Sequence, residues 1–407
     1  MTHDADILIV GGGLNGPALA LALAKVGLTV TVIDSLPRDT RTEAGFDGRA
    51  YALALASVRV LDGIGLWPHV AEHAQPMLKI VASDGRAGEG AAPFFLQFDH
   101  AEIEEGPMGH MLEDRFLRPA LLRAMDDAGV TQLSGETVVA QTVDAQGVTV
   151  TLASGRSLRA RLLVGCDGRD SGTAQRAGIR RTGWDYGQTG LVCAIDHELP
   201  HEGVAHQFFM PAGPLAILPL PGNRSSIVWS ERTARAAEIQ ALDDAAYLEV
   251  LRPHFGNFLG EISLAGKRHA YPLKLTIANQ FIAPRLALVG DAAHGMHPIA
   301  GQGFNFGLRD IAALAEVLAD AARRGEDIAS PLVLDRYQTW RRFDTTLMAI
   351  GTDSVNRLFS NDNPLLRGVR DLGLGLVSAL PGLRRACIRE AAGLTGDMPR
   401  LMRGLPI

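Results

Sequence analysis

The hydrophobic pattern at the start of the chain predicts a strand, a helix and a second strand. Residues 7–10 form a short β-rich run, 14–26 form an apolar helix that Gly27 is placed to end, and 29–33 are again rich in Val, Thr and Ile. This order is a β-α-β unit. We therefore expect an α/β domain that begins here.

The hydrophobic pattern changes in the middle of the chain and then returns to that of buried strands and long helices. Between residues 189 and 271, alternating or β-rich runs are separated by Pro and Gly, with one helical stretch at 234–251. Such alternation is typical of an antiparallel sheet. Residues 286–289 are again a buried strand, and 304–323 form a long helix. The α/β unit is therefore expected to be discontinuous, with the sheet inserted into it.

Composition and charge exclude several classes of protein. The 407 residues suffice for two main units and a tail, and a net charge of −6 provides no basic excess for binding nucleic acid. The cysteines are far apart without a C-x-x-C pair, and His294 and His297 lack further ligands nearby, so neither disulfides nor a metal site are expected. The N-terminus fits a strand better than a signal peptide. We expect a cytoplasmic protein.

The glycine-rich run after the first strand fits the pattern G-x-G-x-x-G. Glycines there allow a tight turn close to a pyrophosphate, and the helix that follows offers amide donors. Asp34, at the end of the second strand, is placed to bind an adenosine ribose. The alternative is a plain turn with a surface aspartate, and the motif does not distinguish FAD from NAD. The residues of the predicted turn are Gly11, Gly13, Leu14, Asn15 and Gly16.

Two further aspartates follow buried strands. Asp167 and Gly168 come after the strand at 162–164, and Asp291 comes after the strand at 286–289. An aspartate at a strand end can bind a ribityl hydroxyl or brace a phosphate-binding loop, although each alone could equally be a turn or cap residue. Their order and spacing favour contact of both aspartates with the same cofactor, at a different part of it from the part that the glycine turn binds.

The segment from residue 298 to residue 305 predicts a close approach to a flat ring. Its glycines let the backbone pass near the ring, and the next helix begins with free amides that would stabilise negative charge on that ring. The alternative is a glycine-rich helix start without a ligand. The residues predicted to contact the cofactor are Pro298, Gly301, Gln302, Gly303, Phe304 and Asn305.

Together these motifs resemble those of the group A flavoprotein aromatic hydroxylases, which share a p-hydroxybenzoate hydroxylase-like fold. Segments 47–67, 271–278 and 297–310 look like signatures of the ubiquinone-biosynthesis hydroxylase branch. The resemblance implies an FAD enzyme that takes hydride from NAD(P)H, activates O2 as a C4a-hydroperoxyflavin and hydroxylates a polyprenylated phenol. No second G-x-G-x-x-G motif follows a strand, so NAD(P)H is expected to bind transiently.

The resemblance also assigns roles to single residues. It implies that Arg49 and Arg115 contact the cofactor and that Asp291 binds its ribityl-phosphate region. An exposed ion pair is the alternative, above all for Arg115, which opens an amphipathic helix.

One position departs from the family pattern. The serine after the Asp-Gly pair, here Ser171, is usually followed by an arginine three residues on. This chain has Ala174 there and an arginine only at Arg176. The part of this segment in handling the nicotinamide donor is therefore left open.

The predicted fold is α/β: a glutathione reductase-like FAD-binding domain with an inserted antiparallel β-sheet substrate domain and a helical C-terminal tail. The FAD-binding domain is expected to consist of residues 1–75, 100–185 and 275–345. The substrate domain is expected to consist of 76–99 and 186–274, and the C-terminal helical region of 346–407.

The substrate is expected to lie between the flavin and the inserted sheet. No acid–base pair is expected, because the flavin carries the oxygen chemistry while the protein supplies orientation and a dry cavity. The candidate pocket residues, chosen mainly by strand alternation, are Gln207, Phe209, Leu218, Trp229 and Pro298.

Two alternative functions stay open. One is another FAD enzyme of the same fold, such as a prenyl-group reductase or a hydroxylase of a soluble aromatic acid, whose pocket would need a cationic anchor. The other is a non-catalytic flavoprotein subunit of a biosynthetic complex.

The tail at 357–407 carries eight arginines against four acids and recurring apolar residues. A basic amphipathic helix can lie on anionic lipid, which would make the protein peripheral on the inner membrane. It can equally pack on the core or on a partner subunit of a biosynthetic complex.

Overall fold

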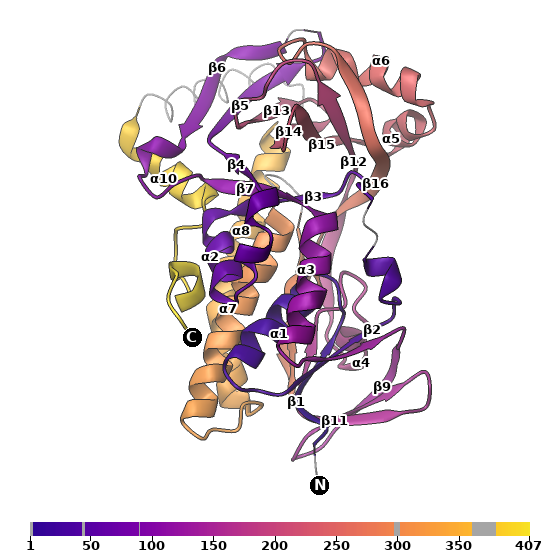
Figure 1. Ribbon diagram of the computed structural model, residues 1–407, viewed down its shortest axis with the longest axis vertical. Coiled ribbons are helices and arrows are strands. Elements are labelled where there is room, and N and C mark those ends of the chain that lie inside the picture. The colour runs from indigo at the N-terminus through magenta and orange to yellow at the C-terminus, as the bar shows by residue number, and fades with distance from the viewer. Residues whose placement is uncertain (1–2, 43–44, 89, 297–301, 360–379) are drawn as a thin grey trace.

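Two eight-stranded sheets and one three-stranded sheet form the framework of the molecule (Figure 1). The structure is a computed structural model, and it describes residues 3–42, 45–88, 90–296, 302–359 and 380–407. In Figure 1 the N-terminal strand lies at the lower end and strands β5 and β6 (Lys79–Arg86 and Gly90–Asp99) at the upper end.

The first large sheet is the one that begins with the β-α-β unit. Its strands are β1 (Ala5–Val10), β2 (Val30–Asp34), β8 (Thr131–Ser134), β9 (Val138–Val143), β10 (Val148–Leu152), β11 (Ser157–Gly165), β17 (Ile282–Ala283) and β18 (Leu286–Leu288). The order is β17-β18-β11-β1-β2-β8, and the pairs from β18 to β8 are parallel. The antiparallel pair β9-β10 is attached to β11. We call this part the parallel-sheet unit.

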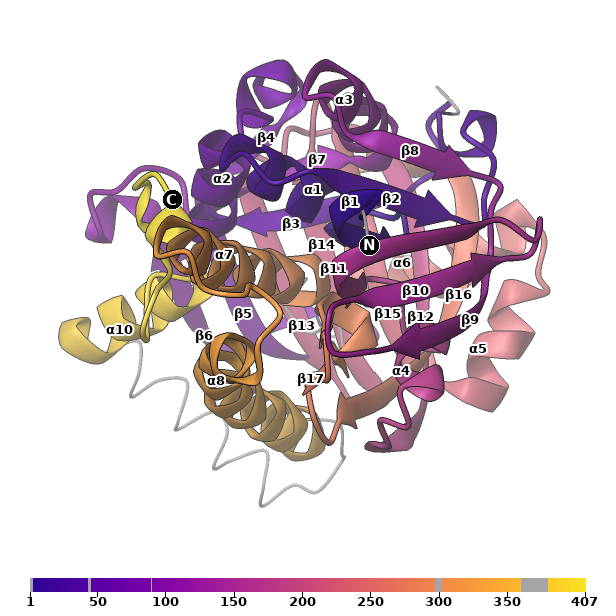
Figure 2. The ribbon, with the colours of Figure 1, turned by 90° about the horizontal axis from the view of Figure 1, so that it is seen from below.

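Three helices pack on the parallel-sheet unit: α1 (Asn15–Lys25), α3 (Asp114–Asp127) and α7 (Gln302–Arg323). They lie together beside the sheet in the view from below (Figure 2). Ile7, Ile9, Leu19 and Leu23 are fully buried between the strands and the helices. This burial explains why both the strands and α1 are so apolar.

The second large sheet is the inserted one. Its strands are β5, β6, β12 (Arg181–His197), β13 (Val204–Met210), β14 (Gly213–Leu220), β15 (Arg224–Arg232), β16 (Ile262–Ala278) and β19 (His294–Gly295). The order is β19-β16-β12-β15-β14-β13-β5-β6. Neighbours are antiparallel, as expected for the inserted sheet, except β13 and β5, which run parallel. Because β5 comes from an earlier part of the chain, no hairpin turn fixes its direction against β13.

Two helices cover the outer face of the second sheet. The single predicted helix at 234–251 is divided into α5 (Thr233–Gln240) and α6 (Asp244–Phe255). The division occurs because the Asp243 carboxylate accepts a hydrogen bond from the Ala246 amide at 2.8 Å and so caps a new helix.

The third sheet joins the two large ones. It consists of β3 (Ala50–Ala54), β7 (Gly109–Glu113) and β4 (Gln75–Met77) in that order, all antiparallel. Helix α2 (Leu55–Gly63) follows β3 directly.

The C-terminal region is anchored to the rest of the protein by ion pairs. Helix α8 (Pro331–Phe359) passes through residue 346 without a break, so the expected start of a C-terminal region falls within a helix. In α10 (Pro381–Ala391), Arg384 pairs with Glu102 at 2.9 Å and Arg389 pairs with Glu105 at 2.8 Å.

The last part of the tail completes the main core. Leu394, Leu401 and Met402 are buried in the same cluster as β1 and α1, and Arg400 pairs with Glu316 of α7 at 3.1 Å. Of the alternatives considered for the tail, packing on the core therefore applies to this stretch. Among the described residues, no helix is long and apolar enough to cross a membrane.

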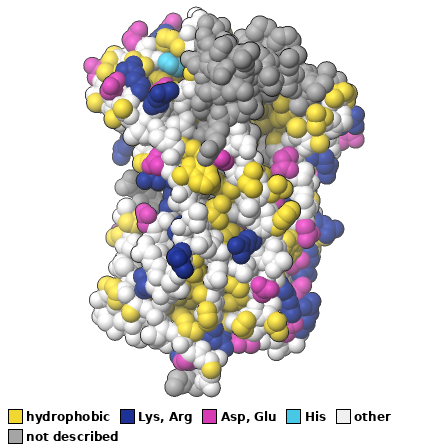
Figure 3. Space-filling view, turned by 180° about the vertical axis from the view of Figure 1, so that it is seen from behind, with side chains coloured by type: hydrophobic (Ala, Val, Ile, Leu, Met, Phe, Trp, Pro, Cys, Tyr) yellow, Lys and Arg dark blue, Asp and Glu magenta, His cyan; other side chains and the backbone are white. Residues whose placement is uncertain are grey.

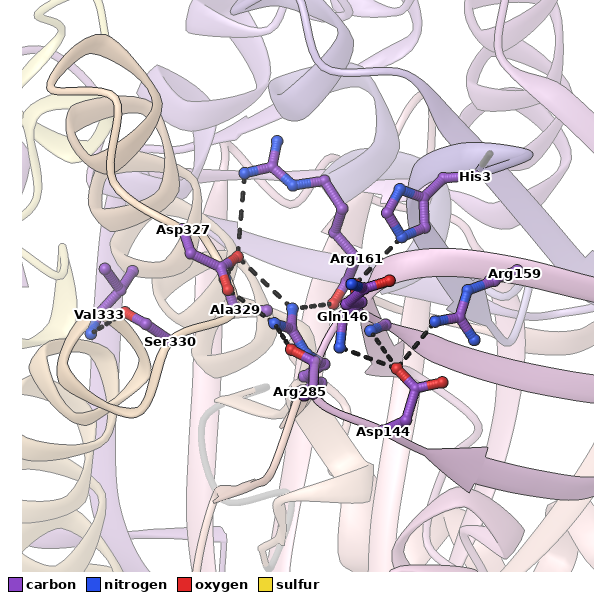
Figure 4. Close-up of polar contacts among 12 residues, drawn as sticks. His3, Asp144, Gln146, Arg159, Arg161, Arg285, Asp327, Ala329, Ser330 and Val333 are labelled. Carbon is purple, nitrogen blue, oxygen red and sulfur yellow. Dashed lines mark hydrogen bonds and ion pairs between the residues drawn. The ribbon is translucent and has the colours of Figure 1, made fainter. Parts of the chain in front are cut away.

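Arg285 joins three separate segments at the start of β18 (Figure 4). Its guanidinium donates hydrogen bonds to the carbonyl oxygens of Ala145 and Arg161, at 2.6 and 3.1 Å, and to the Asp327 carboxylate at 2.7 Å. Arg285 has a φ of +53°, a backbone conformation that residues other than glycine rarely adopt. These contacts tie the β9–β10 turn and the loop between α7 and α8 to β18.

A buried carboxylate ties the loop after β18 to two helices. Asp310 of α7 is fully buried and accepts hydrogen bonds from the Gly290 amide at 2.8 Å, from His294 at 2.7 Å and from Arg341 of α8 at 2.7 Å. Burial alone would raise the pKa of Asp310, but His294 and Arg341 outweigh it and lower the pKa.

The variant Arg341→Met is expected to lower the free energy of unfolding by roughly 3–5 kcal/mol at pH 7, because the buried Asp310 carboxylate loses the guanidinium that compensates its charge. In the native protein the ionised Asp310 contributes stability above its unfolded pKa of about 3.9, and this contribution is lost as pH falls through the lower folded pKa. Without Arg341, burial favours the protonated form of Asp310. The difference in free energy of unfolding between the native protein and the variant should therefore become smaller from pH 7 to pH 4.

Urea unfolding followed by circular dichroism at several pH values measures this deficit. Arg324→Met is the matched control, because the Arg324 side chain is 58% exposed. Equal losses in the two variants would contradict the role of the buried pair.

Candidate active site

Three parallel strands end side by side and bring the sequence motifs together. Val10 of β1 pairs with Gly165 of β11, and Gly165 pairs with Leu288 of β18. The chain therefore leaves these strands at one edge of the sheet, into the glycine turn, the first Asp-Gly motif and the Gly290-Asp291 motif. Ligands of open α/β sheets bind at this carboxyl edge.

A groove of about 420 Å³, which we call the nucleotide groove, runs along this edge. The residues of its wall that matter here are Gly11, Gly13, Asp34, Glu136, Asp167 and Arg176.

The glycines of the turn serve two different purposes. A Cβ atom at Gly11, where φ is +107°, would lie 2.4 Å from the carbonyl oxygen of Cys166, and a Cβ at Gly16 would lie 1.9 Å from that of Gly11. These two glycines are needed for the close packing of strand and helix. A Cβ at Gly13 would meet no atom of the described residues within 4 Å. Gly13 therefore leaves space in front of the N-terminus of α1.

Asp34 is held at the far side of the groove. Its carboxylate accepts hydrogen bonds from the amides of Gly12 and Leu36, at 2.5 and 2.8 Å. The buried Arg41 lies beside it and donates to the Gly12 carbonyl at 3.0 Å and to Ser134 at 2.5 Å. Sequence reasoning missed Arg41, because no local pattern links it to the glycine turn.

A second hollow of about 490 Å³, which we call the central cavity, lies between the glycine turn and the inserted sheet. Leu14 and Asn15 line one side, Gly303 and Phe304 line another, and the sheet supplies mainly apolar side chains. Those from β14 and β15 are Ala216, Leu218, Ser226 and Val228.

Charged and aromatic groups at and near the start of β3 form another part of the cavity wall. Arg49 donates to Asp47 at 2.7 Å and lies 3.3 Å from the Asp114 carboxylate. The Tyr51 hydroxyl donates to Asp114 at 2.7 Å, and burial raises the pKa of Tyr51, so it stays protonated. The Tyr51 and Phe304 rings lie 5.9 Å apart.

Asn15 marks the junction of the groove and the cavity. It packs so tightly against Gly290 and Gly307 that a Cβ at either glycine would lie 2.2 or 2.1 Å from its side chain. Its Oδ1 atom is buried and has no hydrogen-bond partner among the described residues. Buried polar atoms are normally satisfied, so this acceptor fits a ligand that brings a donor.

The two hollows share the glycine turn, because Gly13 lines the groove and Leu14 lines the cavity. A ligand that occupies both must be long, with an anionic centre at the N-terminus of α1, a ribose near Asp34 and a flat ring near Phe304. FAD has this form, and the open space at Gly13 and the unsatisfied oxygen of Asn15 fit it.

Comparison with known proteins agrees with this fit. Residues 4–348 match the family model described as FAD binding domain. Ubiquinone hydroxylase UbiL of Rhodospirillum rubrum is 46% identical over 407 residues, covering 99% of this chain and 94% of its own. The chain belongs to the FAD-dependent aromatic hydroxylases, in their ubiquinone-hydroxylase branch.

Two further relatives of this hydroxylase extend the comparison. The 3-demethoxyubiquinol 3-hydroxylase of Escherichia coli is 37% identical, covering 97% of this chain and all of its own. The crystal structure of p-nitrophenol 4-monooxygenase PnpA from Pseudomonas putida superposes with a TM-score of 0.80 at 21% identity, covering 98% of this chain and 100% of that one. The predicted fold, the FAD cofactor and the monooxygenase class are therefore confirmed, and NAD(P)H and O2 are the co-substrates typical of the class.

The hydroxylase's two motif aspartates have different surroundings. Asp291 lines the central cavity, and its carboxylate lies 3.3 Å from Arg169. Asp167 accepts hydrogen bonds from the hydroxyl of Ser171 at 2.5 Å and from the amide and hydroxyl of Thr173 at 2.9 and 2.8 Å. Asp167 therefore also fixes the start of the short helix α4 (Gly172–Arg176), which is the capping role considered as its alternative.

The two arginines suggested by the family resemblance lie in different places. Arg49 lines the central cavity. Arg115 pairs with Glu113 at 2.5 Å, packs over the Phe46 and Phe116 rings, and is absent from the walls of both hollows. Arg115 therefore forms an ion pair with a buried carboxylate, and its predicted contact with the cofactor stays a prediction.

The predicted flavin-contact segment is only partly described. Pro298 and Gly301 lie outside the described residues, and Gln302 is described only as the first residue of α7. Gly303 and Phe304 line the central cavity. The Asn305 amide donates to the Ala52 carbonyl at 2.7 Å and accepts from the Ala54 amide at 2.9 Å, so it clamps β3 to α7.

Strand alternation predicted the pocket residues with mixed success. Leu218 lines the central cavity. Gln207 and Phe209 pair with Ala216 and Pro214 and so share the cavity face of the sheet, but they are not part of the cavity wall.

The prediction for Trp229 is wrong. Its side chain is fully buried on the opposite face, where its ring lies 6.4 Å from that of Tyr247 and 4.7 Å from that of His254. Its neighbour Val228 faces the cavity instead, because successive side chains of a strand alternate between faces.

Gly13→Ala tests whether the nucleotide groove holds the cofactor. The added methyl meets no described protein atom, so we expect the apoprotein's stability to change by less than about 0.5 kcal/mol. FAD affinity should fall at least about tenfold, because the methyl would occupy the space in front of α1.

Fluorescence titration with FAD and thermal unfolding of the apoprotein measure the two effects. Gly382→Ala, which also has open space at its Cβ but lies in α10, is the control. Unchanged FAD affinity in Gly13→Ala would refute the assignment of the groove.

Proposed function

We propose that this hydroxylase adds an oxygen atom to the ring of a polyprenylated phenol in ubiquinone biosynthesis. Two relatives that match nearly the whole chain are named as ubiquinone and demethoxyubiquinol hydroxylases. The observation that carries the proposal is the apolar wall of the central cavity next to the FAD site. Val192, Ala216, Leu218, Val228 and Leu273 form it.

The charge distribution of the sheet disfavours a soluble aromatic acid as substrate. Such an acid would need a cationic anchor in the sheet. Arg224, the only arginine at 206–230, is the first residue of β15 and pairs with Asp196 at 2.7 Å. Arg224 is not part of the cavity wall.

The residues around the FAD site have two tasks in the proposed reaction. FAD, when bound, supplies the oxygen chemistry. The apolar side chains of β14 and β15 exclude water from the ring that reacts. Ser226 and Tyr271 bring hydroxyl groups to the sheet wall, and burial raises the pKa of Tyr271, so it can donate a hydrogen bond to the phenol oxygen.

Turnover distinguishes this function from its alternatives. With a prenylated phenol, the purified protein should oxidise NAD(P)H, consume O2 and form a hydroxylated product that mass spectrometry detects. A protein that retains FAD but turns over none of these substrates would be a non-catalytic subunit, and turnover of a soluble acid alone would indicate the other hydroxylase class.

Ala216→Trp tests the central cavity as the substrate site. The indole would fill the apolar wall, so product formation should fall roughly 100-fold, about 2.7 kcal/mol, while FAD stays bound. Ala241→Trp, at the exposed end of α5, serves as the control. Normal turnover by Ala216→Trp would place the substrate elsewhere.

We propose that the hydroxylase also makes peripheral contact with the inner membrane, from the cytoplasm, through its C-terminal region. Hydrophobic side chains form patches on the face shown in Figure 3. The exposed apolar side chains that support the proposal are Leu347 and Ile350 of α8, Leu380 directly before α10 and Leu383 of α10. The exposed Arg385 adds a positive charge on α10 that can approach anionic lipid.

Vesicle flotation with anionic lipid tests this contact. Replacing Leu347, Ile350, Leu380 and Leu383 by Ser should reduce the bound fraction severalfold, because the apolar area that enters the lipid is lost. Leu332→Ser, at the other end of α8 and 79% exposed, is the control. Equal binding of the fourfold variant and the native protein would exclude the contact. Deleting the whole tail would be uninformative, because it removes buried core residues.

A further inference from the structure

The nucleotide groove contains one positive charge. Among the described residues that line it, Arg176 is the only cation, whereas Asp34, Glu136 and Asp167 are acids. Burial lowers the pKa of Arg176 while Asp167 opposes the shift, and a guanidinium remains charged in proteins. The groove therefore presents a single, partly desolvated guanidinium to whatever it binds.

Arg176 reaches the groove by folding back along α4. The Ala174 side chain is fully buried, so an arginine at that position would have to enter the core. A Cβ at Gly172 would lie 2.8 Å from the Nη1 atom of Arg176, which means that the guanidinium occupies the space that this glycine leaves open. Its Nε donates to Gln141 of β9 at 3.1 Å, and its Nη2 donates to the Thr173 hydroxyl at 3.4 Å.

These two hydrogen bonds fix the guanidinium on the groove wall. A planar group held at Nε and through one N–H of Nη2 keeps its remaining N–H donors and its flat face available to a ligand. The wall that faces the glycine turn and Asp34 is thus preorganised before any ligand binds.

We propose that Arg176 binds the adenosine half of FAD and thereby makes the protein prefer FAD over FMN. The glycine turn separates the nucleotide groove from the central cavity, and the cavity has the apolar walls and the α7 N-terminus that suit the flavin ring. The half of FAD in the groove is then the adenosine half. A guanidinium can stack on adenine or donate to the ribose and phosphate oxygens. FMN lacks this half and makes no such contact.

The test compares the affinities of FAD and FMN for the full-length protein after its flavin has been removed. Quenching of flavin fluorescence gives both dissociation constants. Arg176→Ala should raise the dissociation constant of FAD about tenfold and that of FMN less than threefold. Arg176→Lys, which keeps the charge but loses the planar fork, should lie between Arg176→Ala and the native protein.

Two controls keep the proposal open to refutation. Arg180→Ala removes an exposed arginine four residues on and should change neither constant. Circular dichroism and thermal unfolding of each apoprotein report on folding.

Equal weakening of FAD and FMN binding would make Arg176 a structural residue. Unchanged FAD affinity with a raised KM for NAD(P)H would assign Arg176 to binding of the hydride donor. Either result overturns the proposal.

Discussion

The charged hydrogen bonds of Asp310 fix the place where the functional parts of this hydroxylase meet. They join the loop that carries Asp291 to α7 and, through Arg341, to α8. A carboxylate buried this deeply persists only when its charge is compensated. The same helix clamps β3 through Asn305, so the cavity wall and the cofactor edge are held by one element. The positions of Arg49, Tyr51 and Phe304 depend on that arrangement.

The groove and the cavity differ in polarity, and this difference suits the two halves of the reaction. The groove has acids, one arginine and open backbone at Gly13, which are groups that bind a polar nucleotide. The cavity is bounded mainly by apolar side chains, which provide the dry environment that oxygen chemistry on a flavin requires. One long cofactor can occupy both environments, because the groove and the cavity both border the glycine turn.

Local patterns in the sequence predicted the parts of the fold that depend on neighbours in the chain. The strands around Gly11 and Asp291 and the long α7 follow from periodicity and glycine placement. The break before Asp243 was missed, because one capping hydrogen bond outweighed a continuous helical pattern. Trp229 was assigned to the wrong face, since alternation gives two sets of residues without saying which set faces inward.

Other features depend on contacts between distant parts of the chain. Arg41 joins Gly12 and Ser134, and the arginines of α10 pair with glutamates more than 280 residues earlier. A basic amphipathic pattern looks the same whether its partner is a lipid or an acidic surface of the same protein. Only the structure shows that part of the tail completes the core.

The order of the strands in the parallel sheet has a consequence for synthesis on the ribosome. β1 occupies an inner position, yet its neighbour β11 is made about 150 residues later, and β18 beyond it more than 270 residues later. The second sheet, whose strands are mostly consecutive, can form while this edge of the first is still open. One edge of β1 must therefore stay unpaired for many seconds at ordinary elongation rates, while β2 pairs with its other edge. Such a chain is a natural client for chaperones that shield exposed hydrophobic segments.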